Sequence, residues 1–338
     1  MPPDCGWTTP GETCSATPTI PEVPMPSADH ALAVLLPDAV RLGLVPALGE
    51  ELQARGFFPV ACRSLQLDEE HLSTLYAGTR SKTSESGRQY GVLLTARLAA
   101  MDSSLAVVLG RRDGRDASRT LHDAKGASVP FERAPGTLRW LSRVSGRCLS
   151  LLHTPDDFAE ARRDIAALFA PMGIDEVVAM DRRPSWREIA DLRAYVPPGD
   201  ESSRHSAVVT AILRLSVALT VDTAQSVGLG FPEVAALARD FLADAPATDP
   251  FDEAKRFACF CDQARERATA GYSPRPSPGS FGHLLTALVD PRCHSLRLGF
   301  ELVRAMESAG FRLTDFEQQR LLTSLAFHQS EYLKERLP

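Results

Sequence analysis

The sequence lacks long hydrophobic runs and a cysteine framework, and each absence excludes a class of protein. No apolar stretch approaches the roughly 18 to 20 residues that a membrane-spanning helix needs. The N-terminus has neither the basic start nor the apolar segment of a secretory signal peptide. The seven cysteines are odd in number and scattered, which favours free thiols in a reducing compartment. We therefore expect a cytoplasmic protein with no membrane partner.

Positive charge is also in short supply, because 37 Lys and Arg residues face 43 Asp and Glu residues, for a formal net charge of −6. Proteins that bind nucleic acid usually present a basic face, so this balance predicts no nucleic-acid partner. One basic pocket for a small polyphosphate remains compatible with it, since net charge does not describe a single site.

Three stretches of different character divide the 338 residues. Seven prolines fall between Met1 and Pro26, so we expect residues 1–28 to form a disordered leader. Residues 29–172 alternate strand and helix signals, whereas residues 183–338 carry helical signals only, for about six helices. The join is expected near residues 170–184, and the chain is long enough for two domains.

Within the first domain, short apolar runs predict four buried strands, at residues 31–36, 57–67, 105–109 and 148–152. Helical spacing and caps predict helices at residues 43–55, 68–76, 92–100 and 157–169. Residues 110–135 are rich in Gly, Arg and Asp, and are expected to be largely irregular. This order of elements predicts an α+β sandwich of ferredoxin type.

The second domain is expected to be all-α. Its clearest signals are the capping boxes that begin at Ser185 and Thr314, each with a glutamate three residues later. Cys259 and Cys261 are two residues apart on a predicted helix, so their side chains would point in nearly opposite directions. We therefore expect no metal site of the protein's own here.

Three blocks of the first domain read Leu36-Pro-Asp-Ala-Val-Arg-Leu-Gly-Leu-Val45, Pro135-Gly-Thr-Leu-Arg139 and Ser150-Leu-Leu-His-Thr-Pro-Asp156. In sequence and in order, these blocks resemble the nucleoside diphosphate kinase family. Ordered blocks are more specific than any one motif. The resemblance implies a ferredoxin-like nucleoside-diphosphate-kinase-type sandwich, which agrees with the order of elements, followed here by the all-α domain.

The resemblance also implies phosphoryl transfer through a histidine. A nucleoside triphosphate would phosphorylate His153, and a nucleoside diphosphate would collect the phosphate, with Mg²⁺ bound through the nucleotide phosphates. A neutral imidazole is a suitable nucleophile near neutral pH. Asp164, on the following helix, matches the acidic residue that orients the imidazole.

The same resemblance implies further residues that bind the nucleotide. Arg119 and Arg139 are candidates for phosphate contacts, because a guanidinium binds phosphate oxygens in pairs. The other candidates are an active-site tyrosine, an arginine, a base-stacking aromatic residue and a ribose contact, which fall at Tyr76, Arg88, Tyr90 and Ser150.

Several positions depart from the family pattern. Leu36 replaces a lysine that contacts the transferred phosphate, and losing such a contact costs about 10²-fold or more in rate. Pro155 replaces a serine, and Asp164 replaces a glutamate that is one methylene longer. The segment 110–135 is longer than expected. Cations that could compensate for the lost lysine are Arg41, Arg111, Arg112 and Lys125.

Two functions therefore stay open at the level of sequence. One is an atypical nucleoside-diphosphate-kinase-like phosphotransferase, which the preserved His153 favours. The other is a degenerate, catalytically weak nucleotide-sensing module whose helical domain binds a protein partner, which Leu36 favours. Assembly into a homo-oligomer is also left open.

Overall fold

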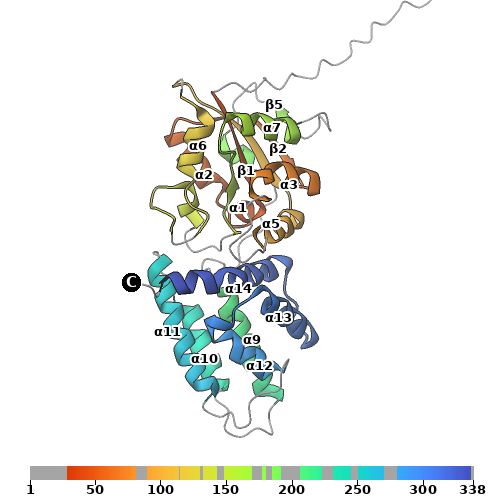
Figure 1. Cartoon of the computed structure of the whole chain (residues 1–338), viewed down its shortest axis with the longest axis vertical. Coiled ribbons are helices and arrows are strands. Elements are labelled where there is room, and N and C mark those ends of the chain that lie inside the picture. The colour runs from red at the N-terminus through yellow and green to blue at the C-terminus, as the bar shows by residue number, and fades with distance from the viewer. Residues whose placement is uncertain are drawn as a thin grey trace, which may run out of the picture.

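The computed structural model has an α+β part and an all-α part, stacked along the long axis of the molecule (Figure 1). This arrangement confirms the predicted fold class. The leader 1–28 lies outside the residues that the structure describes. The described residues are 29–80, 90–113, 115–129, 132–142, 148–169, 177–179, 185–191, 206–222, 231–244, 250–269 and 280–335.

A five-stranded sheet forms the centre of the α+β part, and its neighbouring strands are antiparallel. In spatial order the strands are β4 (Leu152–His153), β1 (His30–Leu35), β3 (Ser104–Gly110), β2 (Phe58–Leu65) and β5 (Val177–Ala179). β1 and β3 are almost entirely buried, as their continuous apolar sequences require for strands covered on both faces. The short strand β4 places His153 beside Val34, at one edge of the sheet.

Helices cover both faces of this sheet, so alternate residues of β1 enter two different cores. One core is closed by α2 (Val45–Ala54), α6 (Ala117–Lys125), the 3₁₀ turn η2 (Leu138–Ser142) and α8 (Trp186–Asp191). The opposite core is closed by α3 (Glu69–Leu75), α5 (Tyr90–Met101) and α7 (Phe158–Phe169). The short helices α1 (Pro37–Arg41) and α4 (Ala77–Arg80) complete this part.

The structure corrects two expectations for the first domain. Residues 117–125 form α6 rather than irregular chain, because the Asp116 side chain caps its first turn and accepts from the Arg119 backbone N–H at 2.9 Å. The last strand begins at Leu152 rather than Cys148, because Leu151 has a φ of 66° and interrupts the extended backbone. The join also contributes a strand, β5, which the sequence did not predict.

The all-α part contains six α-helices among residues 206–335 that the structure describes, in line with the expected number. They are α9 (Ser206–Asp222), α10 (Phe231–Ala243), α11 (Pro250–Thr269), α12 (Phe281–Leu288), α13 (Leu296–Ser308) and α14 (Asp315–Glu335). They enclose one apolar core of their own. None of the described helices is long and apolar enough to cross a membrane.

Both predicted capping boxes are present. The Thr314 backbone N–H donates to Glu317 at 2.7 Å, and the Glu317 backbone N–H donates to the Thr314 hydroxyl at 3.2 Å. The box at Ser185 begins α8, but this helix packs on α2 through Trp186 and not with the all-α core. A Cβ at Gly49 of α2 would lie 2.0 Å from Trp186 Cγ, so glycine is what allows this close packing.

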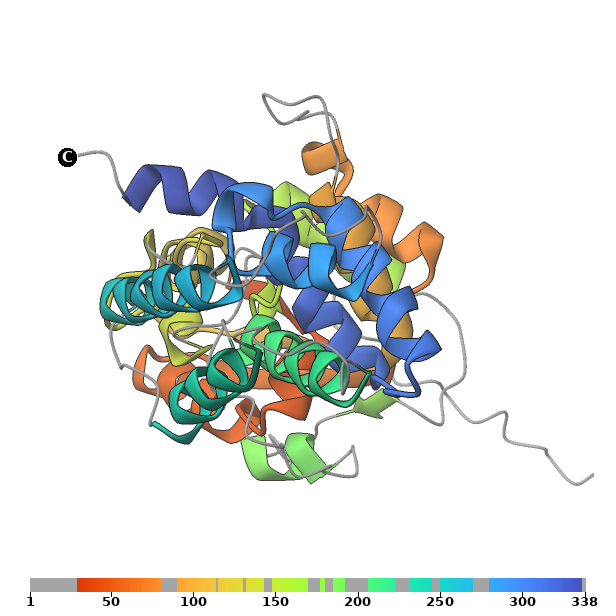
Figure 2. The ribbon, with the colours of Figure 1, turned by 90° about the horizontal axis from the view of Figure 1, so that it is seen from below.

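The two parts meet along α14, which runs beneath α1 and α5 (Figures 1 and 2). Phe316 belongs to the apolar core under α3, α5 and α7, where it is 2% exposed. The Gln319 amide donates to the Leu94 carbonyl at 2.6 Å, and Arg97 donates to Gln318 at 2.7 Å. The helical part is therefore joined to the first domain by both apolar and polar contacts.

Candidate active site

A tight turn sets the direction of the chain just before His153. Leu151 has a positive φ of 66°, which a residue with a side chain rarely adopts. The Leu152 N–H donates back to the Ser150 carbonyl at 2.8 Å, which closes a γ-turn around Leu151. The Asp38 carboxylate accepts from the Leu151 N–H at 2.9 Å. A buried side chain from α1 thus holds the strained turn in place.

Asp38 is itself completely buried. Burial raises the pKa of Asp38 to about 6, although its backbone hydrogen bonds and the charge of Arg133 oppose the shift. Burying a carboxylate beneath this turn costs folding free energy. The hydrogen bond that Asp38 accepts from the Leu151 N–H explains why the residue lies there.

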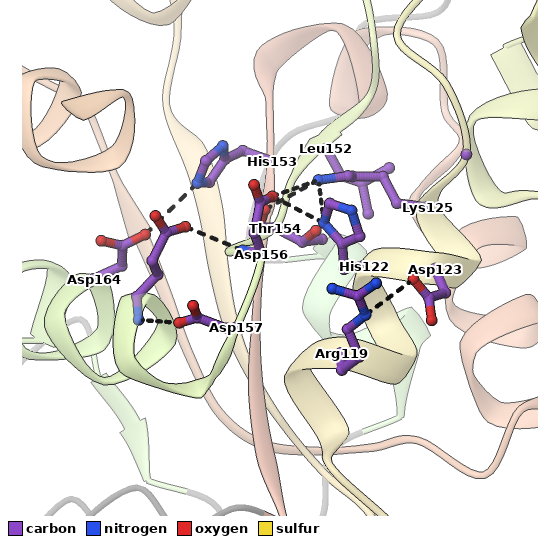
Figure 3. A network of polar contacts seen from close by, with 12 residues as sticks. Arg119, His122, Asp123, Lys125, Leu152, His153, Thr154, Asp156, Asp157 and Asp164 are labelled. Atoms are coloured by element: carbon purple, nitrogen blue, oxygen red, sulfur yellow. Dashed lines mark hydrogen bonds and ion pairs between the residues drawn. The ribbon is translucent and has the colours of Figure 1, made fainter. Parts of the chain in front are cut away.

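His153 lies between α3 and α7, with 15% of its side chain exposed. Its Nε2 is 3.7 Å from Oδ2 of the fully buried Asp164, which is longer than a hydrogen bond. The other oxygen of Asp164 accepts from Arg163 Nε at 2.9 Å. The Tyr76 ring lies 4.9 Å from the His153 ring. Nδ1 is therefore the ring nitrogen that faces away from Asp164 (Figure 3).

The surroundings of His153 favour the neutral imidazole. Burial lowers the pKa of His153, the positive charges of Lys125 and Arg139 lower it further, and Asp164 opposes them. Because the shift is downward from 6.5, the ring is mostly unprotonated at neutral pH, and an unprotonated imidazole is the form that can act as a nucleophile.

The helix α6 presents a row of three basic side chains, Arg119, His122 and Lys125, spaced so that they share one face. Lys125 Nζ donates to the Thr154 carbonyl at 3.1 Å, and His122 Nδ1 lies 2.9 Å from Asp156 Oδ1 (Figure 3). The last two members of the row therefore reach the segment that follows His153.

Comparison with known proteins gives matches to the first domain. The family model described as nucleoside diphosphate kinase matches residues 29–174. A nucleoside diphosphate kinase of Actinobacillus pleuropneumoniae serotype 5b is 30% identical over 142 residues, which cover 42% of this chain and 95% of that protein. The chain belongs to the nucleoside diphosphate kinase family.

Two further relatives show the range of the likeness. The nucleoside diphosphate kinase of Pyrococcus horikoshii is 25% identical over 48% of this chain and 96% of its own length. Among solved structures, the halophilic enzyme of Halobacterium salinarum in complex with CDP is 25% identical, with a TM-score of 0.37. That alignment covers 45% of this chain and 93% of the halophilic one.

The two arginines singled out by the resemblance to the kinase family have other partners. Arg139 donates to three backbone carbonyls, those of Ser150, Gly126 and Leu152, at 3.0 to 3.2 Å. Arg119 is mostly exposed, and its Nε lies 3.5 Å from Asp123 of the same helix. Arg139 thus ties η2 and the end of α6 to β4, and Arg119 stands at the outer end of the basic row.

The remaining residues implied by the kinase family are placed as follows. Tyr76 packs against His153 and is partly buried, and this burial raises the pKa of its phenol. Ser150 is buried in the strained turn. Tyr90 begins α5, but its side chain lies outside the described residues, as does the whole of Arg88. Leu36 is 1% exposed inside an apolar core and brings no charge.

The sequence did not indicate that His122 belongs to the basic row, or that Asp38 bonds to Leu151. His122 was not singled out because the segment around it was expected to be irregular. The signal that could have found it is Asp116 at the N-cap, followed by basic residues three positions apart. Asp38 gave no local signal, because its partner Leu151 is more than a hundred residues away in the sequence.

Proposed function

We propose that this protein is an atypical nucleoside-diphosphate-kinase-like phosphotransferase that works through a phosphohistidine at His153. The observation that supports this most is the orientation of the ring. One nitrogen lies 3.7 Å from a buried carboxylate, the other faces away from it, and the charge of Lys125 in the basic row acts on the ring. The pKa of the ring is also lowered, which keeps it nucleophilic at neutral pH.

In the proposed first half-reaction, the Nδ1 lone pair attacks the terminal phosphorus of a nucleoside triphosphate. An N–P bond forms as the bond from that phosphorus to the bridging oxygen breaks, and the electron pair leaves with the nucleoside diphosphate. The ring then carries positive charge and a proton on Nε2. Asp164, 3.7 Å from Nε2, stabilises that charge.

In the second half-reaction, a terminal phosphate oxygen of another nucleoside diphosphate attacks the same phosphorus. The N–P bond breaks, its electron pair returns to Nδ1, and the neutral His153 is restored. Because each half-reaction uses the same atoms in opposite order, one site serves donor and acceptor.

Mg²⁺ enters this proposal as part of the substrate, bound to the nucleotide phosphates. Among the described residues, no group of three or more His, Cys, Asp and Glu side chains could hold a metal ion. The carboxylate nearest to the basic row is the exposed Asp156, which already lies beside His122 and Lys125. Bound to the phosphates, the ion neutralises charge that develops in transfer.

A second function is favoured by one observation. Leu36 lies in the same apolar core as Phe316 of α14, so a side chain from the helical part helps to form the core that holds position 36. This arrangement suits a module that binds nucleotide without transferring phosphate, and that signals nucleotide binding to the helical part and its protein partner.

The free cysteines among the described residues favour a cytoplasmic location for either function.

Labelling with γ-³²P ATP and Mg²⁺ distinguishes the two functions. For the phosphotransferase, wild type takes up acid-labile, base-stable label that passes to GDP, and His153→Ala takes up none. Nucleotide binding without any label would overturn the phosphotransferase and support the sensor. The oligomeric state of the protein is measured in the same samples by light scattering.

A further inference from the structure

We propose that Lys125 of α6 binds the terminal phosphate of the nucleotide and supplies the positive charge that position 36 lacks. This inference rests on the proposed function, since it names the group that would neutralise the transferred phosphate. Phosphoryl transfer depends on cations placed before the reaction, because negative charge is spread over the phosphate oxygens in the transition state.

The other cations near the site are already engaged. Arg139 directs its guanidinium to three backbone carbonyls, and Arg119 lies beside Asp123 at the exposed end of the row. Leu36 is apolar and buried. Among the described residues, Lys125 and Arg139 are the cations whose charge acts on His153. Lys125 is therefore the better placed of these to meet a phosphate.

Lys125 also keeps donor capacity. Its ammonium has three N–H donors, of which the Thr154 carbonyl takes one at 3.1 Å. His122 Nδ1 lies 3.4 Å away and takes at most one more. The nearest carboxylate, Asp156, is 3.8 Å from Nζ, beyond hydrogen-bond length, and is itself exposed. At least one donor remains for an incoming phosphate oxygen.

The position of Lys125 is fixed relative to His153. Thr154 is the residue after His153, so the bond to its carbonyl anchors Nζ to the chain beside His153, and the Lys125 charge acts on the His153 ring. Only 11% of the Lys125 side chain is exposed, and in such partly buried surroundings the attraction between an ammonium and a phosphate is less screened than in water. A lysine that served only to tie α6 to β4 would need one N–H donor and no charge available to a ligand. Lys125 differs from it, because at least one further donor remains.

Isothermal titration in Mg²⁺ with AMP-PNP, which has the terminal phosphate, and with AMP, which lacks it, tests the inference. Lys125→Gln is expected to weaken AMP-PNP binding about ten- to hundredfold and to leave AMP binding within about twofold. Lys125→Arg keeps the charge and should retain most of the AMP-PNP affinity. Lys255→Gln, on the exposed surface of α11, is the matched control and should bind as wild type does.

An equal loss of AMP-PNP and AMP binding in Lys125→Gln, or no loss at all, would overturn the inference. If Lys125→Gln does not fold, wild type alone provides the test. Its preference for AMP-PNP over AMP should then decline as the pH rises through about 8, because burial and the Arg139 charge lower the pKa of Lys125 to about 8. A preference that stays constant through that range would also overturn it.

Failure of this inference and failure of the proposed function give different results. In one case wild type shows no label on His153, and Lys125→Gln loses the preference for AMP-PNP over AMP. The phosphotransferase is then overturned, and Lys125 remains a phosphate ligand. If wild type is labelled and Lys125→Gln binds AMP-PNP normally, the role of Lys125 is overturned and the phosphotransferase remains.

Discussion

At the scale of single residues, the site combines a neutral imidazole with a protonated amine. The pKa of His153 is lowered by burial, and the pKa of Lys125 is lowered to about 8 by burial and by the Arg139 charge. Asp156 and Glu160 oppose the shift at Lys125, and Asp164 opposes the shift at His153. Burial acts in the same direction on both groups, but it leaves one uncharged and the other charged at pH 7.

These two pKa shifts predict the pH profile of phosphotransfer. On the acid side, activity should persist to a lower pH than an ordinary imidazole pKa of 6.5 would allow, because the pKa of His153 is lowered. As pH rises through about 8, Lys125 loses its proton and kcat/KM should decline. Lys125→Arg should move the alkaline decline to higher pH, since a guanidinium keeps its charge. An alkaline decline that is the same in both proteins would exclude Lys125 as its source.

Residue types near the site were predictable to different degrees. His153 was predicted from a matched block and Asp164 from the helix that follows it, and the structure places the two side chains 3.7 Å apart. The shortened carboxylate does stop short of a hydrogen bond, as the loss of a methylene suggests. For Arg139 the sequence suggested a phosphate contact and could not show its three carbonyl partners, because these are set by the folded backbone.

At the scale of elements, the γ-turn before β4 depends on Asp38. An acid whose folded pKa is raised stabilises the protein below its unfolded pKa, and that stability is lost as pH rises through the folded value. For Asp38 the window runs from about 4 to about 6. Charging this buried carboxylate costs on the order of 3 kcal/mol across the window.

Asp38→Asn should therefore change the pH dependence of stability. The variant retains an acceptor for the Leu151 N–H but carries no titrating group. Urea unfolding is expected to show that the free energy of unfolding of wild type, relative to the variant, falls as pH rises from about 4 to about 6. A constant difference between the two proteins over that range would show that Asp38 is not buried as described.

Elements with strong periodic or apolar signals were predicted well, and those that depend on one residue were not. β1 and β3 were visible as apolar runs. The helix α6 was obscured by Gly, Arg and Asp around it, although Asp116 caps it and Leu121 anchors it in the core. The start of β4 was placed too early because apolar residues on either side of Leu151 look like one strand, and nothing local shows the positive φ.

At the scale of the whole molecule, the main addition to the kinase-like domain is the helical part docked through α14. The sequence predicted the helices and the capping box at Thr314. It did not predict what α14 contacts, because periodicity locates an apolar face but does not identify the surface that packs against it. Phe316 and Leu36 lie in one core, and Arg41 stacks over the Phe316 ring at 5.3 Å. An ammonium at position 36 would have to be buried in that core.

Removing the Phe316 ring tests this docking. Phe316→Ala should lower the free energy of unfolding by about 3 to 5 kcal/mol, because it leaves a cavity in a packed core. Amide exchange along α5 should also become faster. Phe300→Ala, on an exposed position of α13, is the control and should change neither. Unchanged exchange along α5 in Phe316→Ala would mean that α14 does not stabilise the first domain.

The most direct test of the central claim is to determine which ring nitrogen of His153 receives the phosphate. The protein is incubated with ATP and Mg²⁺, and ³¹P NMR of the phosphoprotein distinguishes the two positions. Because Nε2 faces Asp164 and Nδ1 faces away from it, the account predicts a single phosphohistidine at Nδ1 of His153, absent from His153→Ala. Phosphate on Nε2, or on another residue, would contradict it.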